Sequence, residues 1–217
     1  MTDIYITGVF PSADGNFLSV EISNDTGKEK FRILETLLEG SGLNRHSGES
    51  EGIRIDEENY IKLKRLDEYT KAVVKGINLL SYSQNTSAGI ARKLFNYGFS
   101  KETCEFAGRY LKKHGYINEE LQASLLSETL ATKKIYGKMR IEKELKTKGF
   151  PSSVISKVLE DGDYDFDEIC KKRILKTVEI EKLGDGAYRQ KMFFKLRQYG
   201  FSTENITKAL EEIYEEK

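Results

Sequence analysis

The sequence has few of the features that cross-link a chain through disulfides or anchor it in a membrane. Only two cysteines, Cys104 and Cys170, occur among the 217 residues, and their spacing is not that of a CxxC pair. This excludes a disulfide scaffold and fits a reducing compartment. No stretch approaches the roughly 18 apolar residues of a membrane span. The first residues show no basic region followed by an apolar core, as a secretory signal would. We therefore expect a cytoplasmic protein without a membrane partner.

The chain also lacks a net charge, since 35 Lys and Arg residues balance 35 Asp and Glu residues. The balance is uneven along the chain: residues 1–68 hold 8 basic and 14 acidic residues, whereas residues 69–217 hold 27 and 21. Residues 130–150 alone hold seven basic and two acidic residues. Such asymmetry permits an acidic or polyanionic partner, but a solvated helix face would explain it equally well.

An internal repeat is the strongest pattern in the sequence. Three segments align without gaps, each starting 51 residues after the previous one: IARKLFNYGFSKETCEFA, IEKELKTKGFPSSVISKV and MFFKLRQYGFSTENITKA. Three positions are identical in all copies, as Leu, Gly and Phe. These structural turn residues are Leu94, Gly98, Phe99, Leu145, Gly149, Phe150, Leu196, Gly200 and Phe201.

The identical residues predict a helix that ends in a Schellman turn. Glycine tolerates the left-handed backbone that follows such a helix, and the next residue packs its apolar side chain against the helix. Ser100 and Ser202 can cap the helix that follows, and Pro151 starts it in the second copy. Cys104 aligns with Ile155 and Ile206, which predicts a buried thiol. A third amphipathic helix precedes each helical pair and completes the period.

We predict a mainly α-helical fold of three tandem three-helix repeats behind a small β-rich extension. Residues 1–66 form the extension. Its apolar runs, separated by turn residues, predict three strands followed by a short helix. The repeats then occupy residues 67–116, 117–163 and 164–217. The first helices of the repeats are expected near residues 67–81, 118–132 and 166–183, with a separate helical stretch at 56–66.

The second repeat resembles the motif of the RecX regulatory proteins. Residues 136–150 read YGKMRIEKELKTKGF: a turn rich in Lys and Gly, then Ile, then Glu-Leu, then Lys-Gly and an apolar residue. The strands that precede Ile55 resemble the extension of the Gram-positive members. Two positions depart from the family pattern, with Thr86 in place of a Ser N-cap and Gly89 in place of a capping-box Glu. They predict a less firmly capped helix in the first repeat.

The resemblance implies an elongated, curved array of helices that modulates the RecA recombinase. Members of this family bind the RecA–DNA filament and inhibit its ATPase, strand-exchange and coprotease activities. For this chain the resemblance implies a non-enzymatic regulator of recombination and the SOS response, acting as a monomer without a cofactor. The alternative is a helical module that binds nucleic acid directly. The zero net charge makes us expect weak, salt-sensitive binding to DNA alone.

The candidate partner-binding residues are basic side chains of the helix that ends in each Schellman turn, or of the segment before it. Because Ile141 and Leu145 define the buried face of the helix in the second repeat, most of its cations must be exposed. Exposed arginines suit carboxylate or phosphate partners alike. The candidates are Arg92, Lys93, Lys133, Lys134, Lys138, Arg140, Lys143, Arg189, Lys191, Lys195 and Arg197.

No catalytic or metal site is predicted. His46 and His114 have no nucleophile or ligand set near them in the sequence, so surface histidines explain both. The acid-rich stretch that begins at Asp161 has Phe166 at the sixth position and Lys172 at the twelfth, where a calcium loop needs Gly and Glu.

Overall fold

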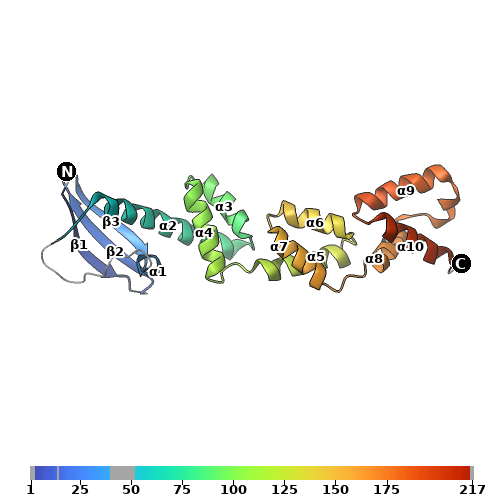
Figure 1. Ribbon diagram of the computed structural model, residues 1–217, viewed down its shortest axis with the longest axis horizontal. Coiled ribbons are helices and arrows are strands. Elements are labelled where there is room, and N and C mark those ends of the chain that lie inside the picture. Colours follow the sequence, from blue (N-terminus) through green and yellow to red (C-terminus); the bar gives the residue numbers. More distant parts are fainter. Residues whose placement is uncertain (1–2, 14, 40–51, 216–217) are drawn as a thin grey trace. The chain divides into compact units, whose positions relative to one another are not determined.

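The computed structural model describes residues 3–13, 15–39 and 52–215 (Figure 1). The chain divides into two compact units, residues 1–83 with 90–114, and residues 84–89 with 115–217. The fold is mainly helical behind an N-terminal antiparallel sheet, as predicted. His46 lies outside the described residues. None of the helices in the described ranges is both long and apolar enough to cross a bilayer.

The first unit begins with a four-stranded antiparallel sheet in the order β3-β2-β1-β4. The strands are β1 Ile4–Pro11, β2 Phe17–Asn24, β3 Gly27–Leu34 and β4 Ile53–Ile55, and α1 (Glu35–Glu39) follows β3. Alternate residues of β2 are buried, at Leu18, Val20 and Ile22. The sequence predicted three strands. The fourth has only three residues, too few to display an alternating pattern.

One long helix, α2 (Glu57–Tyr82), covers the sheet and continues into the first repeat. In its first half Leu63 is buried in the core of the sheet. In its second half Gly76 lies so close to Leu111 that a Cβ there would be 2.6 Å from that side chain. The two helical stretches predicted at 56–66 and 67–81 are therefore one helix, which passes the expected border after residue 66 without a break.

The same helix also protects the outer edge of the sheet. The Asp67 carboxylate accepts a hydrogen bond from the backbone N–H of Arg32 at 2.9 Å, and the Thr70 hydroxyl accepts one from that of Leu34 at 2.9 Å. These β3 donors face away from β2, so they would otherwise be available to a foreign strand.

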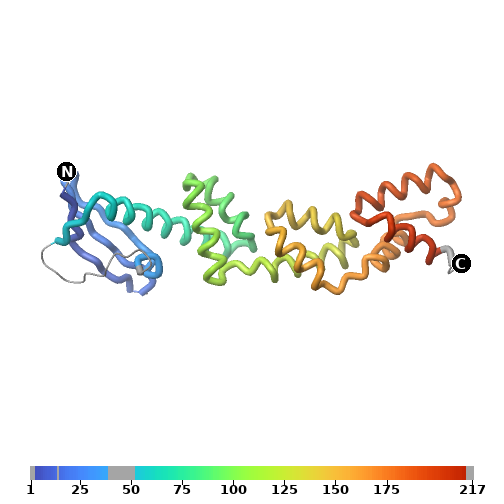
Figure 2. Tube along the Cα trace, viewed as in Figure 1, coloured from blue at the N-terminus to red at the C-terminus, as the bar shows by residue number. Residues whose placement is uncertain are grey.

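The remaining helices follow the predicted repeat. The first repeat adds α3 (Ser87–Asn96) and α4 (Lys101–Lys113) to α2. The second unit holds α5 (Glu119–Thr132), α6 (Lys138–Thr147) and α7 (Ser152–Asp161), then α8 (Phe166–Thr177), α9 (Gly186–Gln198) and α10 (Thr203–Glu215). The first and third helices of each repeat pack against each other. Figure 2 shows the chain path through these elements.

The helix predicted at 166–183 ends earlier, at Thr177. Val178 adopts an extended conformation with φ −114° and ψ 128°, and a short 3-10 helix, η1 (Ile180–Gly184), follows it. Val178 and Leu183 are both buried in the core of the third repeat. The break lets both side chains reach that core.

The predicted Schellman turns are present in all three repeats. Gly98, Gly149 and Gly200 have φ values of +92°, +85° and +93°. In each turn the N–H of the following Phe donates to the carbonyl of the conserved Leu four residues before the Gly, at 3.4, 3.2 and 3.4 Å. The N–H of each Gly donates to the carbonyl three residues earlier, at 3.0, 2.9 and 3.0 Å. The recurring Leu–Gly–Phe triplet is therefore turn chemistry.

Candidate partner-binding site

The predicted basic residues lie mainly on α6 and α9 of the second unit. Lys93 and Arg140 are half-buried, and the other nine are exposed. Arg92 and Lys93 belong to α3 and lie in the first unit, while Lys133 and Lys134 follow the end of α5. Figure 1 shows α6 and α9 end to end within the second unit.

The end of α9 meets the start of α6 through backbone hydrogen bonds. The N–H of Gly137 donates to the carbonyl of Tyr199 at 2.9 Å, and the N–H of Met139 donates to that of Gly200 at 3.2 Å. The free carbonyls at the C-terminus of one helix thus satisfy free N–H groups at the N-terminus of the next. The contact is too close for larger residues, because a Cβ on Gly137 would lie 2.3 Å from the carbonyl oxygen of Gly200.

A buried arginine of α8 clamps the segment that leads into α6. Arg173 is 8% exposed, and its guanidinium donates to the carbonyl of Ile135 from Nε at 3.1 Å and from Nη2 at 3.0 Å. Nη2 also donates to the carbonyl of Lys134. The guanidinium carbon lies 4.1 Å from the centre of the Tyr199 ring. Ile135 has a φ of +53°, which is unfavourable for a β-branched residue, so the clamp holds a conformation that the segment would otherwise leave.

The junction of α6 and α9 is hollowed into an open groove of 570 Å³. Three of the predicted cations line it, namely Arg140 and Lys143 from α6 and Arg197 from α9. Two apolar side chains line it as well, Met139 at 43% exposure and Phe194 at 59%. We call this feature the junction groove. It brings cations of the second and third repeats together. Its full lining is Met139, Arg140, Lys143, Phe194, Arg197, Gln198 and Gly200.

Most of the predicted cations have no acidic partner among the described residues. The exception is Arg140, whose Nη2 lies 2.8 Å from a carboxylate oxygen of Glu144. Some other lysines of the second unit are paired, for example Lys157 with Glu120 at 2.7 Å and Lys208 with Asp167 at 2.6 Å. On α6 itself Lys146 is paired with Glu142. The unpaired cations of α6 and α9 contribute a local positive potential.

Sequence reasoning missed three parts of this arrangement. Met139 was inside the recognised motif but carried no charge, and Phe194 was not singled out because the search followed basic residues. Arg173 gave no signal, because a single arginine on a helix reads as a solvated side chain. The glycines at positions 137 and 200 were the one clue to the junction in the sequence, because each lies at the end of a predicted helix and leaves room for a close approach.

The start of α3 is firmer than the sequence predicted. The Thr86 hydroxyl accepts a hydrogen bond from the N–H of Gly89 at 3.0 Å and donates to the carbonyl of Lys148 at 3.2 Å. Glu119 at the start of α5 accepts from the N–H of Ser87 at 3.0 Å. The Thr86 hydroxyl therefore caps α3, and a glutamate from another helix satisfies a further N–H of its first turn, so the cap is firmer than expected.

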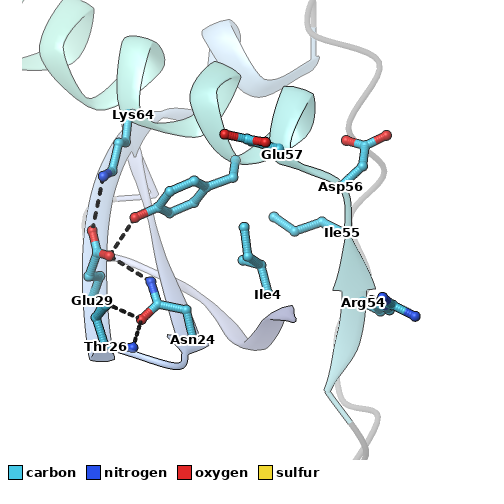
Figure 3. A pocket seen from close by; sticks show the side chains of 10 residues that line it. Ile4, Asn24, Thr26, Glu29, Arg54, Ile55, Asp56, Glu57 and Lys64 are labelled. Carbon is cyan, nitrogen blue, oxygen red and sulfur yellow. Dashed lines mark hydrogen bonds and ion pairs between the residues drawn. The ribbon is translucent and has the colours of Figure 1, made fainter. Parts of the chain in front are cut away.

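Another cavity lies away from the predicted basic residues, in the first unit (Figure 3). It has a volume of 820 Å³ and is lined by residues of the sheet and α2. Its polar groups pair with one another, because Glu29 accepts hydrogen bonds from Tyr60 at 2.5 Å and from Asn24 at 2.9 Å and lies 3.8 Å from Lys64. These bonds, led by that of Tyr60, hold the pKa of Glu29 below its usual value. We read the cluster as a support for the sheet–helix contact.

The cysteines and the described histidine lie in packed or stacked positions. Cys104 and Cys170 are both buried, as the repeat predicted for Cys104. Burial raises the pKa of the Cys170 thiol to about 12, so it carries almost no thiolate at neutral pH. His114 stacks on Tyr110, with ring centres 4.0 Å apart. Within the ranges described, no three His, Cys, Asp or Glu side chains are grouped as metal ligands would be.

Comparison with known proteins finds that the chain is similar to RecX regulatory proteins. No protein-family profile matches the chain. The regulatory protein RecX of Chlorobium phaeobacteroides is 27% identical over 144 residues, which are 66% of this chain and 94% of that protein. RecX of Finegoldia magna is 26% identical over 197 residues, 86% of this chain and 95% of that protein. RecX of Clostridioides difficile is 25% identical over 171 residues, 75% of this chain and 77% of that protein.

Solved structures carry the same fold. A crystal structure of a regulatory protein RecX superposes with a TM-score of 0.66 and 21% identity, covering 93% of this chain and 96% of that one. RecX from Lactobacillus salivarius gives a TM-score of 0.59 and 21% identity, covering 67% of this chain and 96% of that one. The first of these matches extends over nearly the whole chain. With the curated relatives and the Leu–Gly–Phe repeat, it shows that the chain is similar to RecX regulatory proteins in sequence and shares their fold.

Proposed function

We propose that this protein regulates the RecA recombinase by binding the RecA–DNA filament through the basic side chains of α6 and α9. The observation that carries the proposal is the set of exposed cations on these two helices, which are joined end to end in the second unit. Most of them have no acidic partner among the described residues, whereas Arg140 is paired with Glu144 and Lys146 with Glu142. The likeness to RecX proteins suggests the partner. The proposed role inhibits RecA ATPase, strand exchange and coprotease activity, and it requires no catalysis by this chain.

The direct test measures RecA ATP hydrolysis on single-stranded DNA while this protein is titrated in. We expect inhibition at amounts below one protein per RecA monomer, because a regulator bound in a filament affects more than the subunit that it touches. Hydrolysis that stays unchanged across the titration would remove the inhibitory role.

A charge-reversed variant tests the proposed surface. Changing Lys138, Arg140 and Lys143 to Glu reverses three cations of α6 and should weaken inhibition by at least about tenfold, because each rim charge contributes to steering and to affinity. Lys157 serves as the matched control, since Lys157→Glu reverses an exposed cation of α7 in the same unit. Both variants must keep the wild-type circular dichroism. Full inhibition by the triple variant would exclude this face.

The alternative function is direct binding to nucleic acid without RecA, which the same cations would favour. A protein that neutralises several phosphates loses affinity steeply as salt rises. We expect only weak binding of duplex or single-stranded DNA at physiological salt. Sub-micromolar affinity there, measured by fluorescence anisotropy, would favour the alternative.

A further inference from the structure

The junction groove combines charge with exposed apolar surface. Phe194 is 59% exposed and Met139 is 43% exposed, and both line the groove with Lys143 and Arg197. Phe, Met and Arg are enriched where proteins contact proteins. A groove with both kinds of side chain matches a ligand in which acidic residues lie within a few positions of an apolar residue.

The groove is built before any ligand arrives. Its two walls belong to helices whose ends are hydrogen-bonded to each other, Gly137 to Tyr199 and Met139 to Gly200. The Arg173 clamp fixes the segment that leads into α6. A ligand therefore meets a backbone frame that is already positioned, and little backbone entropy is lost on binding.

The cations in the groove differ in how many of their hydrogen-bonding groups already have a partner within the protein. Nη1 of Arg197 donates to the carbonyl of Phe201 at 3.0 Å, and Arg140 is paired with Glu144. The Nε atom of Arg140 is buried and has no acceptor within the described part of the chain. Lys143 is exposed and unpaired among those residues. The groove therefore offers a few directed cationic contacts instead of a continuous basic track.

This pattern favours a protein ligand over a nucleic acid. A phosphate backbone gains from a long series of cations, whereas here Glu144 lies beside Arg140 and neutralises part of the charge. Phosphates would also leave Met139 in water. A carboxylate-bearing peptide with one large apolar side chain uses both features of the groove at once.

We propose that the junction groove binds an acidic protein segment that carries one aromatic or long aliphatic side chain. The carboxylates of the segment contact Lys143 and Arg197, and its apolar side chain covers Met139 and Phe194. The inference rests on the proposed function, because it assigns this groove to the protein component of the filament and not to its DNA. It is a statement about the chemistry of the ligand, which can be tested without the filament.

The test uses the full chain and three fluorescent probes. The first is a short synthetic peptide of Asp and Glu with one central Phe, the second replaces this Phe with Ser, and the third is an oligothymidylate of matched charge. We expect the Phe peptide to bind about tenfold more tightly than the Ser peptide, and both to bind more tightly than the oligonucleotide, measured by anisotropy at physiological salt.

Two variants locate the binding. Phe194→Ser should remove the preference for the Phe peptide, and Lys143→Glu should weaken both peptides. Lys176→Glu reverses an exposed cation of α8 outside the groove and should change neither. Equal affinity for the two peptides, or a preference for the oligonucleotide that Lys143→Glu abolishes, would overturn the inference.

The RecA assay separates this inference from the proposed function. If the chain distinguishes the peptides but leaves RecA unaffected, the function is wrong and the groove inference stands. If RecA is inhibited fully by Phe194→Ser and the peptides are not distinguished, the function stands and the groove inference falls.

Discussion

At the scale of single residues, position in the repeat determines chemistry more than residue type does. Cys104 occupies the slot that Ile155 and Ile206 fill in the other repeats, and all three side chains are at most 2% exposed. Cys170 on α8 is fully buried. Both thiols therefore act as small apolar groups in a core.

We predict that neither cysteine reacts with iodoacetamide at pH 8 unless the protein unfolds. Because burial raises the pKa of Cys170 to about 12, its thiolate fraction should fall by about 10³ relative to a free thiol. Mass spectrometry after alkylation, in buffer and in denaturant, measures this. Rapid labelling of Cys170 in buffer would contradict the buried position.

At the scale of elements, the ends of helices carry the specific contacts. The Schellman turns could be predicted because their chemistry is local: a left-handed Gly and an apolar residue after it. The junction of α6 and α9 could not, since it depends on Arg173 reaching the carbonyl of Ile135, 38 residues away in the chain. Repeat comparison found the cations of the groove, but Phe194 carried no polar signal and was missed. The three-residue strand β4 was missed because it has no measurable period.

We predict that the Arg173 clamp at this junction contributes to the stability of the protein. Arg173→Ala leaves the carbonyls of Lys134 and Ile135 without their donor and should lower the free energy of unfolding by about 2–4 kcal/mol. Lys172→Ala is the matched control on the same helix, where the exposed pair with Glu168 should contribute at most about 0.5 kcal/mol. Urea denaturation of both variants distinguishes them. A similar small loss in both would mean that Arg173 is not a clamp.

At the scale of the whole molecule, the second and third repeats each contribute their own buried cluster, but they are not independent. The second repeat has a core around Ile141 and Leu145, and the third has one around Ile174 and Leu196. The start of α6 uses carbonyls of the third repeat, and Thr86 before α3 uses a carbonyl of the second. Stability is therefore shared between neighbours, as in other repeat proteins.

Removing the third repeat should loosen the second. In a chain that ends at residue 163, the N–H groups of Gly137 and Met139 lose their acceptors, and we expect amides of α6 to exchange at least about tenfold faster with deuterium. Amides of α2 in the first unit are the internal control and should keep their protection. Unchanged exchange in α6 would show that its start does not depend on the third repeat.

The end-to-end contact also fixes an order of events during synthesis. Ribosomes release the chain from its N-terminus, so the residues of α6 emerge well before Tyr199 and Gly200, whose carbonyls its first N–H groups need. The start of α6 therefore lacks these two acceptors until the third repeat has left the ribosome. A stall in translation between these two points leaves a partly folded nascent protein with its future junction groove split in two.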